Sequence, residues 1–109
     1  MPRHVLTLDL KDDPALIAAY DEHHRAVWPE IEASILASGI HTMTIHRLGT
    51  RLVMILDVAH GFSFARKAAA DAADPVVQRW EALMARFQDV AHDGAKWREM
   101  EEIYRLGGI

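Results

Sequence analysis

The sequence predicts a single α+β domain with a ferredoxin-like antiparallel sheet that carries its helices on one face. Its 109 residues suffice for one hydrophobic core, so we expect residues 1–109 to form one domain. Segments of alternating apolar residues and segments of helical periodicity follow one another in the order β-α-β-β-α-β. Split βαβ repeats of this order build an antiparallel sheet with helices on one side.

The first strand is predicted at residues 3–10, where three leucines alternate with other residues: Leu6, Leu8 and Leu10. Asp13 and Pro14 indicate a helix start, because aspartate caps free backbone N–H groups and proline fits the first helical position. Pro29 cannot lie inside this helix, so we expect a bend there and a second helix that ends near Gly39.

Two further strands are predicted at residues 40–48 and 51–58, joined by a hairpin turn at Gly49-Thr50. An alanine-rich helix follows at residues 64–73, and Asp74-Pro75 repeats the helix-start signal before another apolar helical stripe. We expect a loop at Asp93-Gly94 and a last short strand at Met100–Leu106.

The sheet face away from the predicted helices is also apolar in part. Val5, Val53 and Ile55 lie among the strand residues that point this way. A small sheet usually hides such a face against a copy of itself. The sequence therefore predicts a homodimer in which two sheets pack face to face, a dimeric α+β barrel.

Composition excludes several classes of partner and cofactor. The net charge of −4 and the sequence pI near 5.9 argue against nucleic acid. The absence of cysteine removes thiol chemistry, and no apolar run approaches the roughly 20 residues that span a membrane. The seven histidines show no metal-ligand spacing. We therefore expect a cytoplasmic protein without a metal site, a nucleic-acid partner or a membrane partner.

Tyr20 and His24 are four residues apart, so a helix places them on one face. An imidazole titrates near neutral pH and can exchange protons with a ligand. With Trp28 one turn further on, these side chains predict a small-molecule pocket. On spacing alone, the alternative that both are ordinary packed residues is the more common case.

Three tryptophans stand in this short chain: Trp28, Trp80 and Trp97. Indole rings stack well on the C–H faces of sugars, and their N–H group adds a polar contact. An uncharged, polyhydroxylated ligand would fit a pocket of aromatic rings and one histidine. Core packing is the alternative, above all for Trp80, which lies in the middle of an apolar stripe.

Residues 20–30, YDEHHRAVWPE, resemble the Tyr-x3-His-x3-Trp-Pro-Glu signature of the L-rhamnose mutarotase family. The resemblance extends over almost the whole chain, including Gln78-Arg79-Trp80 and the closing residues 102–106. It implies a dimeric α+β barrel. It also implies an isomerase that interconverts the α and β pyranose anomers of a 6-deoxy sugar, L-fucose or L-rhamnose, without a cofactor.

The resemblance also assigns residue roles. It makes His24 the acid/base catalyst and Tyr20 and Trp80 contacts to the sugar. Met43 stands where the rhamnose enzymes typically carry a tyrosine, and Glu81 where some carry a second tryptophan. Because Met43 and its surroundings resemble a branch associated with L-fucose, we expect this position to contact the substrate and favour L-fucose.

Mutarotation requires only proton movement: the ring oxygen gains a proton while the anomeric hydroxyl loses one, and the opened aldehyde turns before the ring closes. We expect His24 to exchange one proton and Trp97, with Trp80, to hold the apolar face of the sugar. The candidates for the second proton carrier are His4, His46 and Tyr104. The alternatives are a cofactor-independent monooxygenase of the same barrel type and a non-catalytic module that binds a small molecule.

Overall fold

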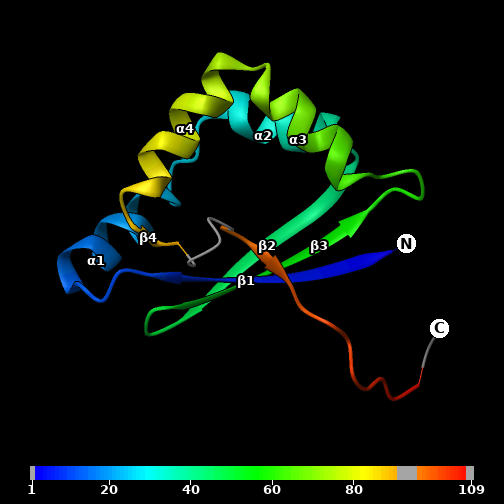
Figure 1. The fold of residues 1–109 in the computed structure, drawn as a ribbon, viewed down its shortest axis with the longest axis horizontal. Coiled ribbons are helices and arrows are strands. Elements are labelled where there is room, and N and C mark those ends of the chain that lie inside the picture. The colour runs from blue at the N-terminus through cyan, green and yellow to red at the C-terminus, as the bar shows by residue number, and fades with distance from the viewer. Residues whose placement is uncertain (1, 91–95, 108–109) are drawn as a thin grey trace.

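The sheet forms one layer of the molecule and the helices form the other (Figure 1). The strands are β1 (Arg3–Leu10), β2 (Ile40–Leu48), β3 (Arg51–Val58), β4 (Gln88–Asp89) and β5 (Arg98–Glu99). The helices are α1 (Pro14–His23), α2 (Pro29–Ala37), α3 (Phe64–Ala72) and α4 (Pro75–Ala85). This computed structural model describes residues 2–90 and 96–107. The predicted α+β class, with helices on one face of an antiparallel sheet, is confirmed.

The strand order is β2-β3-β1-β4, and every pairing is antiparallel. Strand β1 lies inside the sheet and pairs with β3 from Arg3 opposite Asp57 to Asp9 opposite Arg51. On its other side β1 pairs with β4 near Leu10 and with β5 near Leu6. The strand that closes a ferredoxin-like sheet is therefore divided here into two short pieces.

The predicted last strand at Met100–Leu106 is wrong. The strand at this edge is β5, Arg98–Glu99, and the Met100 N–H donates one further hydrogen bond to the Val5 carbonyl oxygen at 2.7 Å. The chain then leaves the sheet (Figure 1), and Ile103 is 92% exposed. Its apolar alternation resembles a strand, but the two glutamates at its start stay in water and no ladder follows.

The predicted helix starts and turns are present. Asp13 accepts hydrogen bonds from the first-turn N–H groups of α1, and Asp74 does the same for α4. Gly39 ends α2 with φ +96°, and Gly49 turns the hairpin with φ +59°, both in the left-handed region that glycine occupies without strain. The predicted loop at Asp93-Gly94 lies outside the described residues.

The core consists of two apolar clusters on the helix-covered face of the sheet. One contains five buried residues: Leu6, Ile40, Met54, Leu56 and Val58. The other contains five more: Leu10, Tyr20, Leu52, Met84 and Phe87. Ile45 and Trp97 are half-buried and pack against both clusters. The predicted alternation of leucines in β1 is confirmed, because Leu6, Leu8 and Leu10 are all buried under the helices.

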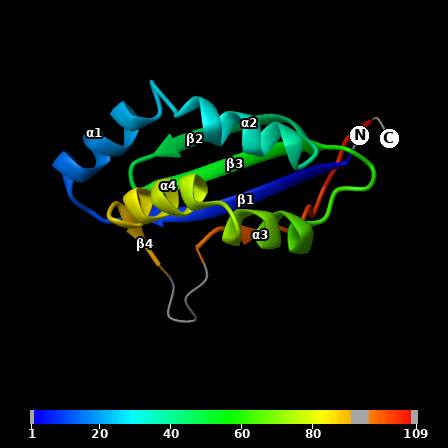
Figure 2. The same ribbon diagram turned by 90° about the horizontal axis from the view of Figure 1, so that it is seen from above.

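Viewed from above, the helices form two rows over the sheet (Figure 2). Helices α1 and α2 run along one side, over β2, and α3 and α4 run along the other side. None of the helices within residues 2–90 and 96–107 is long and apolar enough to cross a membrane. In the described part of the chain, the opposite face of the sheet carries no helix (Figure 1).

Candidate active site

A cavity of about 530 Å³ lies between the sheet and the two rows of helices. Its apolar floor comes from the strands, with Leu6, Met54 and Leu56 among the lining residues. Every helix contributes at least one side chain to the walls. The volume and the mainly apolar lining with a few polar groups are typical of a site for a small molecule.

The expected acid/base residue and the four expected sugar contacts all border this cavity: His24, Tyr20, Met43, Trp80 and Trp97. Tyr20 lies in α1, and His24 is the residue that caps the end of α1. Trp28 is not among the lining residues. Its ring packs edge-on against Trp80, with the ring centroids 5.1 Å apart.

The His24 ring is held by its own helix. Its Nδ1 lies 2.8 Å from the backbone carbonyl oxygen of Tyr20. Because a carbonyl oxygen only accepts hydrogen bonds, Nδ1 carries the hydrogen, and Nε2 of the neutral ring keeps a free lone pair. The imidazole centroid lies 4.3 Å from the Tyr20 ring and 5.9 Å from the Trp80 ring. This imidazole can therefore accept a proton at a defined position.

The Tyr20 side chain is only 3% exposed. Burial and, to a smaller extent, the charge of Asp21 raise the pKa of its phenol to about 12, although a hydrogen bond from Gln88 opposes the rise. The phenol is therefore neutral at physiological pH. It can donate a hydrogen bond to a ligand, but it cannot act as a base.

Helix α1 is fastened to β2 by a two-point ion pair. The Arg47 guanidinium donates to both Asp21 carboxylate oxygens, at 2.6 and 3.0 Å. These hydrogen bonds hold the pKa of Asp21 below its ordinary value. Since Asp21 lies between Tyr20 and His24, the pair fixes which side of α1 faces the cavity.

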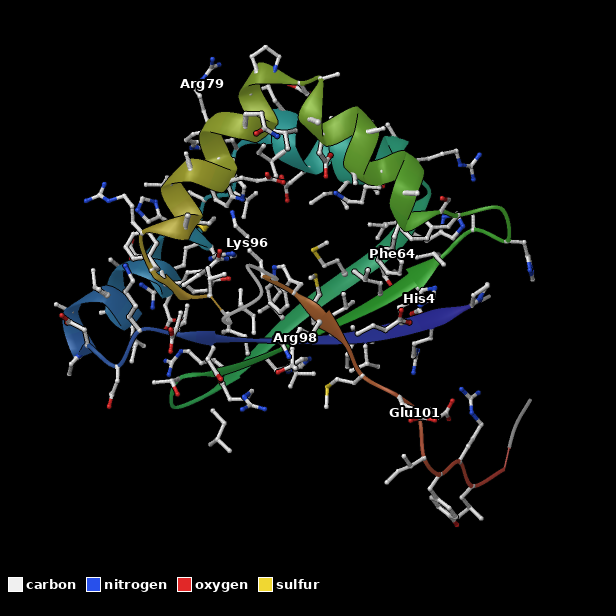
Figure 3. The ribbon with its side chains drawn as sticks, viewed as in Figure 1. His4, Phe64, Arg79, Lys96, Arg98 and Glu101 are labelled. Carbon is white, nitrogen blue, oxygen red and sulfur yellow. The ribbon has the colours of Figure 1, made fainter. Side chains whose placement is uncertain are left out.

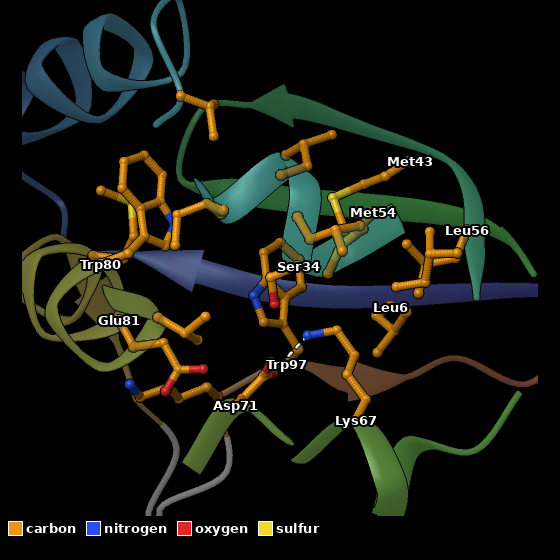
Figure 4. Close-up of a pocket in the computed structure, with 18 of the residues that line it drawn as sticks. Leu6, Ser34, Met43, Met54, Leu56, Lys67, Asp71, Trp80, Glu81 and Trp97 are labelled. Carbon is orange, nitrogen blue, oxygen red and sulfur yellow. Dashed lines mark hydrogen bonds and ion pairs between the residues drawn. The ribbon is translucent and has the colours of Figure 1, made fainter. Parts of the chain in front are cut away.

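Five polar side chains on the cavity wall were not predicted from the sequence: Ser34, Lys67, Asp71, Gln88 and Lys96. Glu81, which stands where some family members carry a second tryptophan, borders the cavity as well. Figure 4 shows Glu81, Asp71 and Lys67 around the cavity, and Figure 3 shows Lys96 between the sheet and the helices while Arg79 points outward. The spacing of Lys67 and Asp71 on an alanine-rich helix was the one available signal for any of them.

Gln88 is the buried polar residue of this site, with 6% of its surface exposed. Its Oε1 has no hydrogen-bond partner within the described part of the chain. A buried acceptor without a partner costs free energy unless a ligand or water supplies a donor. Gln88 therefore leaves an unpaired acceptor beside the cavity, and the oxygen itself is shielded from solvent.

The three candidates for the second proton carrier do not border the cavity. His4 Nδ1 lies 2.6 Å from a carboxylate oxygen of Glu99, and His46 lies exposed on β2. Tyr104 is 74% exposed in the chain end beyond β5. Across residues 2–90 and 96–107, no three His, Asp or Glu side chains gather as a possible metal site.

The model of the L-rhamnose mutarotase family matches residues 3–106. The chain belongs to this family. It is 49% identical to an L-fucose mutarotase of Xanthomonas campestris pv. campestris, over 97% of this chain and 89% of that protein. An L-rhamnose mutarotase of Verminephrobacter eiseniae is 33% identical over 74% of each chain. The prediction of a sugar mutarotase, an isomerase, is confirmed by this membership.

Two solved structures share the fold of this mutarotase. The L-rhamnose mutarotase of Formosa agariphila aligns with a TM-score of 0.74 at 20% identity, over 98% of this chain and 100% of that one. The tetracenomycin F2 cyclase of Streptomyces glaucescens, a type-II polyketide cyclase, aligns with a TM-score of 0.63 at 16% identity over the full length of both chains. The predicted barrel-type α+β fold is confirmed by these similarities.

Proposed function

We propose that this mutarotase interconverts the α and β pyranose anomers of L-fucose, with His24 as the acid/base group and no metal or cofactor. The observation that carries the proposal is the pairing of Tyr20 and His24, one helical turn apart, on the wall of a cavity large enough for a monosaccharide. The choice of sugar is supported by the 49% identity to an L-fucose mutarotase and by Met43 on the cavity wall.

The reaction starts at the anomeric hydroxyl. His24 Nε2 takes the hydroxyl proton while the bond between C1 and the ring oxygen breaks, and the imidazolium that forms gives this proton to the released ring oxygen. The aldehyde turns about the C1–C2 bond, and the reverse proton movement closes the ring on its other face. A well-placed acid/base group accelerates such a step by roughly 10²–10⁴-fold.

The remaining residues bind and orient the sugar in this proposal. The neutral Tyr20 phenol donates a hydrogen bond to a sugar oxygen, and the indoles of Trp80 and Trp97 pack against the C–H face of the ring. Met43 lines the apolar side of the cavity, where the C6 methyl group of a 6-deoxy sugar avoids water.

The protein acts as a cytoplasmic homodimer in this proposal. Val5, Val53 and Ile55 form the apolar centre of the face that no helix covers, and each is only half-buried in one chain. Three large side chains beyond β5 are exposed as well: Ile103, Tyr104 and Leu106. A second copy packed sheet to sheet would remove this apolar surface from water.

Saturation-transfer NMR tests reaction and substrate together, because it measures the rate of anomer exchange directly. We expect the wild-type protein to accelerate exchange of L-fucose most, L-rhamnose less, and D-galactose and D-glucose little. Preference for L-rhamnose would contradict L-fucose as the substrate but would still agree with the proposed mutarotation. No acceleration with any of the four would contradict the proposed function.

A further inference from the structure

Helix α3 faces the cavity with a stripe of four residues: Phe64, Lys67, Ala68 and Asp71. Their spacing of three, four and seven places them on one side of the helix. No residue of α3 is buried, so this helix lacks the apolar anchor that surface helices usually have. The side of α3 that faces the sheet forms part of the cavity wall, and two of the four residues on that side, Lys67 and Asp71, are charged.

The two charges form an ion pair that is largely shielded from water. Lys67 Nζ lies 2.6 Å from Asp71 Oδ2, and the side chains are 22% and 13% exposed. The pair between Glu22, near the end of α1, and Arg25, just beyond it, is in contrast 69% and 72% exposed. Withdrawing charges from water costs free energy that mutual attraction often fails to repay. Hydrogen bonds from a polar ligand in the cavity would offset this cost.

The pair has unused hydrogen-bonding capacity. A lysine ammonium carries three donors, and a carboxylate has acceptor sites on both oxygens. The contact from Nζ to Oδ2 uses one donor and one acceptor site. A donor next to an acceptor matches two neighbouring hydroxyl groups, and hydrogen bonds to charged groups are the stronger kind.

The rest of the cavity places this polar pair against an apolar floor. Figure 4 shows Lys67 and Asp71 joined on the same side as Trp97, with Met54 and Leu56 on the strands beyond. A 6-deoxy sugar has the same division, since one part of its ring carries neighbouring hydroxyls and another carries a methyl group.

We propose that the Lys67–Asp71 pair binds two neighbouring ring hydroxyls of the sugar and so determines which configuration the cavity accepts. The inference rests on the proposed function, but it concerns α3 and not the proton transfer at His24. The pair therefore acts on binding, and its loss raises KM while the catalytic step is kept.

The test measures kcat and KM for L-fucose anomer exchange by NMR in Asp71→Asn and Lys67→Met. We expect KM to rise about tenfold or more in each, because a charge-assisted hydrogen bond is lost, while kcat falls no more than about threefold. Arg66→Met is the matched control, because Arg66 is exposed on the same helix and does not border the cavity. An unchanged KM in both cavity variants, with an active wild type, overturns this inference alone; a wild type without exchange activity overturns the proposed function.

A charge-swapped variant separates binding from a structural role. Lys67→Asp with Asp71→Lys keeps an attractive pair at the same helical spacing but exchanges donor and acceptor. We expect its Tm to match the wild type while KM stays raised. Recovery of wild-type KM would mean that the pair only stabilises α3, and would overturn the inference.

Deoxy analogues identify the hydroxyls. The deoxy analogue that lacks the hydroxyl bound by Asp71 should bind the wild type more weakly than L-fucose does. The Asp71→Asn variant should bind this analogue and L-fucose with equal affinity. If the loss of affinity on removing the 2-, 3- or 4-hydroxyl were the same in Asp71→Asn as in the wild type for all three analogues, the inference would be overturned.

Discussion

The two faces of the sheet are formed by the same strands but differ in what their side chains contact. Strand β3 sends Leu52, Met54 and Leu56 toward the helices, where all three are buried, and sends Val53 and Ile55 to the other side, where both are half-buried. The covered face does not pack into one continuous core. It forms two clusters, and the cavity is lined by residues of both clusters and by polar side chains.

The open face has the opposite distribution of polar groups. Ion pairs stand at both ends of the ladder between β1 and β3, Arg3 with Asp57 and Arg51 with Asp9. The apolar residues lie between them. A polar rim around an apolar centre is typical of a protein interface, whereas polar groups around an internal space are typical of a ligand site. The comparison teaches that one sheet can border a ligand cavity on one face and, in the arrangement we propose, a second copy of the chain on the other.

Loss of the imidazole is the largest change we predict for the covered face. His24→Ala should lower the rate of L-fucose anomer exchange about tenfold or more, because the proton acceptor is removed. Saturation-transfer NMR measures this rate. His23→Ala is the control, since His23 packs on Phe87 and does not border the cavity. An unchanged rate in His24→Ala would remove His24 from the mechanism.

A charge in the centre of the open face should break association and leave the covered face intact. Val53→Asp places a carboxylate between two apolar sheets, and we expect it to convert the dimer to monomers in light scattering at micromolar concentration. Ala82→Asp, exposed on α4, should keep the wild-type mass. Equal masses for the wild type and Val53→Asp would contradict the proposed dimer interface.

The buried phenol predicts a loss of stability in alkali. Because the pKa of the folded Tyr20 phenol is raised to about 12, above its ordinary value of 10.0, its burial stabilises the fold fully below pH 10. That contribution, on the order of 2 kcal/mol, is lost as the pH rises toward 12. Urea unfolding between pH 9 and pH 12 should show this decline in the wild type and a smaller one in Tyr20→Phe. Tyr104→Phe, at an exposed tyrosine, should decline like the wild type.

The smallest predicted effect concerns the fastening of α1. Arg47 lowers the pKa of Asp21, so the pair stabilises the fold above the ordinary carboxyl pKa and is lost as the pH falls through the lowered value. Asp21→Asn should lower Tm by about 2–4 °C near neutral pH and change it less near pH 3. Glu22→Gln removes an exposed carboxylate nearby and should change Tm less at neutral pH. An equal loss at both pH values would contradict the ion pair as the cause.

Sequence signals predicted the fold wherever the cause of structure is local. The caps at Asp13 and Asp74 and the turn at Gly49 depend on residues within one turn of each other, and all three are present. The prediction of a last strand at Met100–Leu106 was wrong, because strand pairing depends on a partner far away in sequence. The alternation of apolar residues in this segment carries no information on whether a partner strand lies beside it.

The same distinction applies to the candidate site. Tyr20 and His24 could be paired from their spacing, because both lie on one helix. Lys67 and Gln88 reach the same cavity from α3 and β4, so only the tertiary structure brings them to that helix. Gln88 lies in a strand of two residues, which has no periodicity that could reveal its direction.

One turn of α1 holds the phenol, the anchoring carboxylate and the imidazole, and this sets where the chain tolerates a change of length. A single residue inserted between Tyr20 and His24 would rotate the imidazole by about 100° around the helix axis. The Asp21 anchor would then hold α1 in a position that turns the ring out of the site. The hairpin at Gly49 has open space beside that residue and does not border the cavity, so an added residue there would disturb the site less.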